Sequence, residues 1–180
     1  MINLAKECNV PSLLPAAFYQ LGRTFGPNQN PIEFAYNEVD TKLLSPEDWA
    51  SLVHGRDQLR IAVTRFLHQF LMLRRKVGTR TSVCGQCPVD RPDAWGCKNY
   101  LKEWWIASCF EMLASEDILF IDPLEGLKKL SDMVSTIQTI CAPCREWVQF
   151  QLVDQREQIW DSLPDYFNLN MFMVNGSSEI

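Results

Sequence analysis

Apolar residues recur at helical spacing along most of the chain. The segment 11–22 shows this clearly, with apolar positions at Leu13, Leu14, Ala17, Phe18 and Leu21. A broader apolar stripe between residues 57 and 75 is typical of a central helix. No stretch reads convincingly as a strand. The pattern predicts an all-α protein, a single irregular helical domain of about six or seven helices.

Capping signals divide this pattern into helices. The runs Ser45-Pro46-Glu47-Asp48 and Asp122-Pro123-Leu124-Glu125 each place a capping side chain before a proline, with an acid in the first turn. Gly55 predicts a stop between two helices. The predicted helices cover residues 1–8, 11–22, 45–55, 57–75, 92–114, 122–139 and 145–162. Residues 1–169 form the predicted domain, and residues 170–180 a frayed tail.

The last predicted helix is rich in large apolar residues. These are Trp147, Val148, Phe150, Leu152, Ile159 and Trp160. We interpret its tryptophans, like the other four, as core residues, because such rings bury a large apolar area.

Composition narrows the class of protein. The chain has 180 residues, 47% hydrophobic and 22% charged, as expected of a globular protein. Its net charge of -5 argues against nucleic acid as the main partner. Residues 1–90 carry 10 Lys/Arg and 8 Asp/Glu, and residues 91–180 carry 7 and 14, so the halves have net charges of +2 and -7. No apolar run approaches the ~20 residues of a membrane span, and no signal peptide precedes the first helix. We therefore expect a cytoplasmic or nuclear protein with no membrane contact.

Seven cysteines carry the candidate chemistry. Cys84 and Cys87 form one C-x2-C pair in a predicted loop, and Cys141 and Cys144 form another at a predicted helix start. Two such pairs can supply four thiolates to one tetrahedral zinc ion, and the amides at a helix start favour the charged sulfur. Cys97 could replace one ligand. The spacing predicts a structural zinc site in which the protein fills every coordination position.

Other interpretations of the thiols stay open. They could be buried side chains that bind no metal, since cysteine is among the most buried residue types. A thiol-disulfide oxidoreductase would also use a C-x-x-C at a helix start, but the βαβ context of such enzymes is missing. His54 and His68 are not expected to be ligands, because cysteines already meet the demand of zinc. No nucleophile, base and orienting acid stand out together, so we expect no enzymatic activity.

Three segments resemble a known family when taken in order. They are Leu4-Ala-Lys-Glu-Cys-Asn-Val-Pro-Ser-Leu-Leu-Pro-Ala-Ala-Phe-Tyr19, then Leu43-Leu-Ser-Pro-Glu-Asp48 with Gly55-Arg56, and finally Cys141-x-x-Cys144-Arg-Glu with Ile159-Trp160-Asp-Ser-Leu163-Pro164-Asp-Tyr-Phe167. Together they resemble the helical region that follows the BTB/POZ domain in proteins of mushroom-forming fungi. The BTB domain itself is not in this sequence, so its dimerisation and cullin docking are not carried over.

The resemblance implies a non-enzymatic protein–protein interaction module. The alternative is a stand-alone scaffold that zinc stabilises. Because Met1 directly precedes the first helix, the chain reads as a truncated protein or a free-standing module. On the first interpretation we expect Ile2 and Leu4 to be exposed, and the chain to self-associate through this helix.

Overall fold

The structure is a computed structural model that describes residues 2–24, 44–76, 97–115 and 118–169. Eight α-helices and one 3-10 helix account for the regular structure of these residues, and none of them lies in a strand. The predicted all-α fold is confirmed. Among the described helices, none combines the length and the apolar character that crossing a membrane requires.

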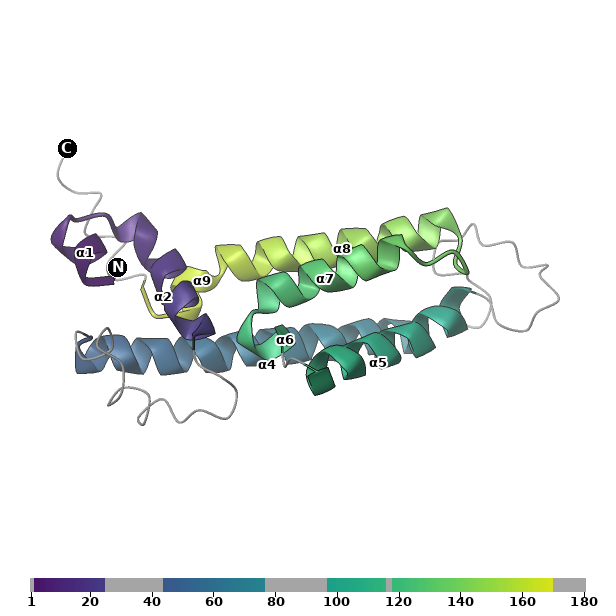
Figure 1. Cartoon of the computed structure of the whole chain (residues 1–180), viewed down its shortest axis with the longest axis horizontal. Coiled ribbons are helices and arrows are strands. Elements are labelled where there is room, and N and C mark those ends of the chain that lie inside the picture. The colour runs from purple at the N-terminus through teal and green to yellow at the C-terminus, as the bar shows by residue number, and fades with distance from the viewer. Residues whose placement is uncertain (1, 25–43, 77–96, 116–117, 170–180) are drawn as a thin grey trace. The chain divides into compact units, whose positions relative to one another are not determined.

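The helices differ from the predicted ones mainly in number and in their ends (Figure 1). Their bounds are α1 Ile2–Glu7, η1 Pro11–Leu13, α2 Leu14–Arg23, α4 Pro46–Lys76, α5 Cys97–Ser115, α6 Ile118–Ile121, α7 Pro123–Ser135, α8 Ala142–Asp161 and α9 Leu163–Tyr166. Leu163-Pro164 begins the short α9, which follows the end of the helix predicted over 145–162 and was not itself predicted. The prediction also missed α6, a single turn.

Tertiary contacts divide the chain into two compact units. Unit 1 comprises Met1–Ile61 with Ile159–Ile180, and unit 2 comprises Ala62–Gln158. The single domain predicted over residues 1–169 stays a prediction. The predicted tail, residues 170–180, lies outside the described residues.

In unit 1, the core is formed where α2 meets α9. The rings of Phe18 and Phe167 lie 5.5 Å apart, and both side chains are fully buried. Leu14 and Leu52 are buried with them. Phe167 also lies directly over Gly55 of α4, where an added Cβ would come within 2.0 Å of the ring.

This close approach explains why α4 continues through Gly55. A glycine within a helix costs about 1 kcal/mol relative to alanine, and the sequence therefore predicted a stop there. Here the missing side chain makes room for a buried aromatic ring, so the helices predicted over 45–55 and 57–75 are one helix. The prediction of a break at Gly55 was wrong.

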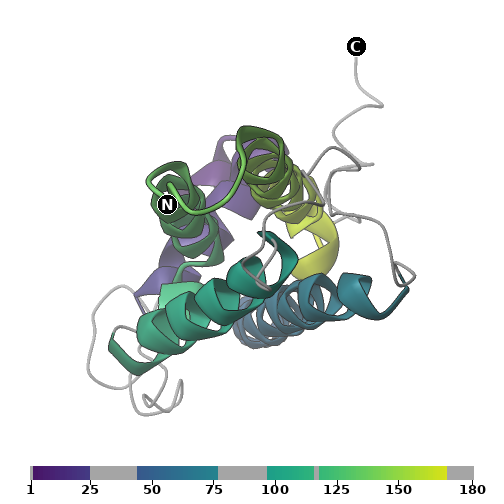
Figure 2. The same cartoon turned by 90° about the vertical axis from the view of Figure 1, so that its right-hand side faces the viewer.

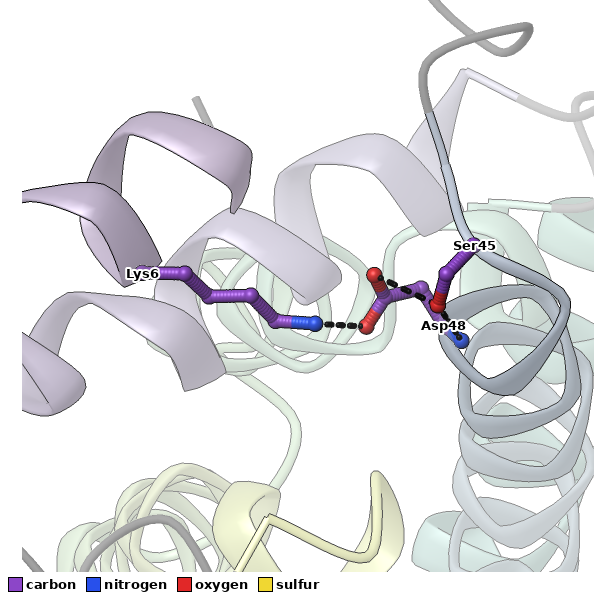
Figure 3. Close-up of polar contacts among 3 residues, drawn as sticks. All are labelled: Lys6, Ser45 and Asp48. Carbon is purple, nitrogen blue, oxygen red and sulfur yellow. Dashed lines mark hydrogen bonds and ion pairs between the residues drawn. The ribbon is translucent and has the colours of Figure 1, made fainter.

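A partly buried ion pair joins α1 to the start of α4 (Figure 3). Asp48, only 4% exposed, accepts a hydrogen bond from Lys6 Nζ at 2.5 Å through Oδ1 and one from Ser45 Oγ at 3.1 Å through Oδ2. Its backbone N–H donates to Ser45 Oγ at 3.2 Å. Ser45 thus caps α4, as the sequence predicted.

The N-terminal helix meets its expectation only in part. Leu4 is exposed, as predicted. Ile2 is buried, so the prediction that it would be exposed was wrong.

In unit 2, the core is an aromatic cluster contributed by three helices. Phe70 of α4 stacks on Trp105 of α5 with ring centroids 3.9 Å apart, and lies 5.7 Å from the ring of Trp147 on α8. Phe66 packs edge-on against Trp105 at 6.0 Å. This part of α4 and α5 run side by side in both views (Figures 1 and 2). The Nε1–H of Trp105 is buried and has no hydrogen-bond partner among the residues that the structure describes.

The helices α7 and α8 form an antiparallel hairpin within the same unit. Asp122 caps α7 as predicted, accepting a hydrogen bond from the backbone N–H of Glu125 at 3.2 Å. Arg145, near the start of α8, donates to the carbonyl of Ile137 beyond the end of α7 at 3.0 Å. Arg156, near the end of α8, donates to the carbonyl of Leu124 at the start of α7, also at 3.0 Å. Both cations of α8 are therefore turned toward α7.

Candidate metal centre

Three cysteines from two distant segments converge in unit 2. The Sγ atoms of Cys97, Cys141 and Cys144 all lie within 4.8 Å of one another. Cys97 and Cys141 are 44 positions apart in the chain. Within the described ranges, this is the group whose donor atoms are close enough to hold a metal ion.

The start of α8 positions two of the three thiols. Cys141 directly precedes the helix, and its carbonyl accepts the first helical hydrogen bond from Arg145 N–H at 3.1 Å. Cys144 is in the first turn, so three positions bring both side chains to the same end of the helix. Pro143 fits this turn because the first amides of a helix have no carbonyl partner within it. The preceding loop is anchored by the buried Ile140.

The start of α5 supplies the third thiol. Cys97 is followed at intervals of four by Leu101 and Trp105, which are both buried. These residues lie on one side of α5, so Cys97 is at the end of the buried face. The backbone N–H of Cys141 donates to Cys97 Sγ at 3.2 Å. A donor aimed at sulfur stabilises a thiolate, the form that binds metal.

The cluster has nearly the dimensions of a loaded zinc site. Zinc–sulfur bonds of about 2.3 Å in a tetrahedron place the sulfur atoms about 3.8 Å apart. Sulfur atoms within 4.8 Å reach that spacing by moves of about 1 Å or less. Cys144 is fully buried, while Cys97 and Cys141 are half-buried. The three thiols can therefore enclose a thiophilic metal ion on the side facing the core.

The outcome for the predicted ligands follows from this geometry. Cys141 and Cys144 lie together, as predicted, and Cys97, predicted as a substitute, lies beside them. Cys84 and Cys87 lie outside the described residues, so their role as ligands stays a prediction. No other cysteine of the described part belongs to the cluster.

The other two cysteines of the described residues, Cys8 and Cys109, have different surroundings. Cys8 is exposed. Cys109 is buried within α5, and burial raises the pKa of its thiol to about 12. Such a thiol stays protonated and unreactive at neutral pH.

The C-x2-C pattern predicts Cys97 only as a substitute ligand, because no other cysteine lies at that spacing from it. The sequence carries another signal that places Cys97 near Cys144, namely the spacing of the apolar residues that follow each cysteine. Cys97, Leu101 and Trp105 on one helix, and Cys144, Val148 and Leu152 on another, both repeat every fourth residue, with a cysteine at the first position of each buried stripe. Two helices that each begin their buried face with a cysteine can bring those thiols together.

Comparison of the chain with known proteins found no relative. The chain matches no family model, no curated protein and no solved structure. The resemblance to the helical region of fungal BTB proteins therefore stays a prediction, and so do the cytoplasmic or nuclear location and the expected self-association.

Proposed function

We propose that this protein is a non-enzymatic protein–protein interaction module whose second unit is stabilised by a structural zinc ion. The convergence of three thiols from the starts of α5 and α8 is the observation that carries the proposal. Zinc accepts thiolates in a closed tetrahedral site and undergoes no redox chemistry, which suits a structural role. The fourth ligand in this proposal is Cys84 or Cys87, the pair that the sequence predicts.

Two features support a scaffold role for the metal. The cluster joins α5 and α8, which are far apart in the sequence, and the metal ion would cross-link these two helices at one end. Further along the same helices, Trp105 and Trp147 meet Phe70 in the core. A metal ion that holds the starts of α5 and α8 together would therefore also help to keep Trp105 and Trp147 packed against Phe70.

The interaction role is supported by the surface of the described helices. Large apolar side chains are exposed on several of them, among them Leu4 and Leu13 in unit 1 and Phe110 and Phe150 in unit 2. An apolar helix face that the core leaves uncovered is a surface on which a helix of another protein can dock.

Metal content and stability test the zinc proposal together. The protein is purified without added zinc and analysed for metal, then titrated with a strong chelator while helicity is followed by far-UV circular dichroism. We expect one zinc per chain, and a fall in the melting temperature of about 10 °C or more on chelation, because losing a ligand present at about 1,000 times its Kd costs about 4 kcal/mol. Replacement by Co²⁺ should give the absorption of a tetrahedral thiolate site.

Single serine variants identify the ligands. C97S, C141S and C144S should each lower the zinc content, whereas C8S and C109S serve as exposed and buried controls and should keep it. Testing C84S and C87S in the same way determines which of them is the fourth ligand. Metal-free protein with unchanged helicity would refute the zinc proposal. Disulfide reductase turnover by that protein would instead favour the oxidoreductase interpretation.

A further inference from the structure

The solvent face of α8 carries an unusual combination of side chains. Within unit 2, Glu146, Phe150, Val153 and Glu157 are all exposed, Phe150 by 64% and Val153 by 41%. Their spacing of four, three and four residues places them within about 60° of the helix circumference, at 100° per residue. We call these four residues the α8 stripe.

The opposite side of the same helix is already occupied by the core. Cys144, Val148 and Leu152 are fully buried. Because α8 thus has apolar residues on two opposite sides, packing of unit 2 does not account for Phe150 and Val153. The prediction that the tryptophans of this helix are core residues was wrong for Trp160, which is 50% exposed, because both sides of the helix are apolar.

The charge on the α8 stripe is entirely negative. The two arginines of α8 donate to carbonyls on the α7 side, at Ile137 and Leu124, and so lie away from the stripe. Asp154, next to the stripe, accepts a hydrogen bond from Gln158 at 2.8 Å and adds a further acid. Glu146 and Glu157 therefore flank an apolar pair with no cation of α8 beside them.

We infer that the α8 stripe is a docking surface for a basic amphipathic helix of a partner protein. This inference rests on the proposed interaction role, but it does not require the metal ion. Glu157 lies eleven positions after Glu146, which is about 16 Å along the helix axis. A complementary partner helix has two apolar residues on one face and a Lys or Arg about one turn, or four residues, out on each side. Its apolar residues cover Phe150 and Val153, and its cations meet the two glutamates.

A peptide built on this spacing tests the inference. The probe is a fluorescein-labelled, C-terminally amidated 15-residue Ala/Gln helix with Lys at positions 2 and 13 and Leu at positions 6 and 9. Binding to the full chain is measured by fluorescence anisotropy. We expect saturable binding with a Kd in the range of about 10–300 μM, which weakens as NaCl is raised from 50 to 500 mM. The same peptide with Glu in place of both Lys should bind at least 10-fold more weakly.

Variants of the chain locate the binding site. F150S should weaken binding at least 10-fold, and E146Q/E157Q should weaken it severalfold. The charge-reversed E146K/E157K should prefer the Glu peptide. F110S is the matched control, because Phe110 is a similarly exposed phenylalanine, 72% exposed, on α5 of the same unit. It should leave the affinity unchanged. All variants should keep the wild-type melting temperature, because the substituted side chains face solvent.

Three results would overturn the inference. The first is no binding of the Lys peptide to the wild-type chain up to 1 mM. The second is equal loss of binding in F110S and F150S. The third is a wild-type dimer in sedimentation equilibrium that F150S converts to a monomer, which would assign the stripe to a second copy of this chain. Zinc content is measured on the same samples. Peptide binding by a metal-free chain would refute only the zinc proposal, and a zinc-loaded chain that does not bind would refute only the docking surface.

Discussion

Replacing Gly55 by alanine separates the two forces that act on this position. On helix propensity alone, alanine within α4 should stabilise the protein by about 1 kcal/mol. In the structure, the new Cβ would lie 2.0 Å from Cδ1 and 2.2 Å from Cε1 of Phe167. Carbon atoms in contact normally lie 3.5–4.0 Å apart, so the ring must move by about 1.5 Å.

The magnitude follows from the surroundings of the ring. Phe167 is completely buried and packs against Phe18, so it has no open space to enter. Overpacking of this kind costs typically 1–3 kcal/mol, and we expect a value at the upper end. After subtraction of the propensity gain, Gly55→Ala should destabilise the protein by about 2 kcal/mol.

Urea unfolding followed by circular dichroism measures this difference, and Gly22 supplies the control. A Cβ at Gly22 of α2 would meet Arg56 Cγ at 3.5 Å, an ordinary contact with a flexible side chain. Gly22→Ala should therefore stabilise the protein by up to about 1 kcal/mol. The two Gly→Ala variants should differ by about 2–3 kcal/mol.

A double-mutant cycle decides whether Phe167 is the cause. Phe167→Ala alone should cost about 3–5 kcal/mol, through lost burial and a cavity. In that background the ring is gone, so Gly55→Ala should become stabilising. The reasoning fails if Gly55→Ala is as stable as Gly22→Ala, or if its cost is unchanged when Phe167 is removed.

Three further predictions concern other buried groups. Lys6→Met leaves the Asp48 carboxylate buried without its cation and should lower the free energy of unfolding in urea by about 2 kcal/mol or more. Adding Asp48→Asn to that variant should recover over half of the loss, and costs of the two substitutions that simply add would contradict the ion pair. Trp105→Phe removes a buried N–H that has no partner among the described residues and keeps an aromatic ring against Phe70. It should therefore cost less than about 1.5 kcal/mol, against about 3–5 kcal/mol for Trp105→Ala, and a cost of Trp105→Phe as large as that of Trp105→Ala would contradict this reasoning. Burial raises the pKa of Cys109 to about 12, so the folded state keeps this thiol protonated while the unfolded chain loses the proton near pH 9. The contribution of this thiol to the free energy of unfolding is therefore complete below pH 9 and declines by at most about 1.4 kcal/mol per pH unit from pH 9 to 12. Urea unfolding at pH 8 and pH 10 measures this decline, and the Cys109→Ala variant should lack it.

The fold class could be predicted from the sequence because local signals and tertiary packing agree at most helices. Ser45 and Asp122 cap α4 and α7 as their side-chain chemistry requires. The disagreements arise where a distant residue decides. Gly55 carries the local signal for a helix end, but Phe167, more than a hundred residues later, makes a glycine necessary inside the helix.

The candidate site could be predicted in part for a similar reason. The C-x2-C pair at residues 141 and 144 is a local motif, and α8 begins where that motif implies. Cys97 has no neighbouring cysteine at metal-ligand spacing, so its place in the cluster depends on how α5 and α8 pack. The exposure of Phe150 was also out of reach, because apolar periodicity cannot tell which side of a helix faces the core when both sides are apolar.

The order in which the chain is synthesised has a consequence for unit 1. This unit is built from the two ends of the chain, while unit 2 is one continuous segment. At about 5–20 residues per second, Phe167 leaves the ribosome on the order of ten seconds after Phe18, the ring on which it packs. During that interval the apolar face of α2 has no α9 to cover it and is available to chaperones. The two segments of unit 1 flank unit 2 in the sequence, so unit 1 can close only after the whole of unit 2 has been made.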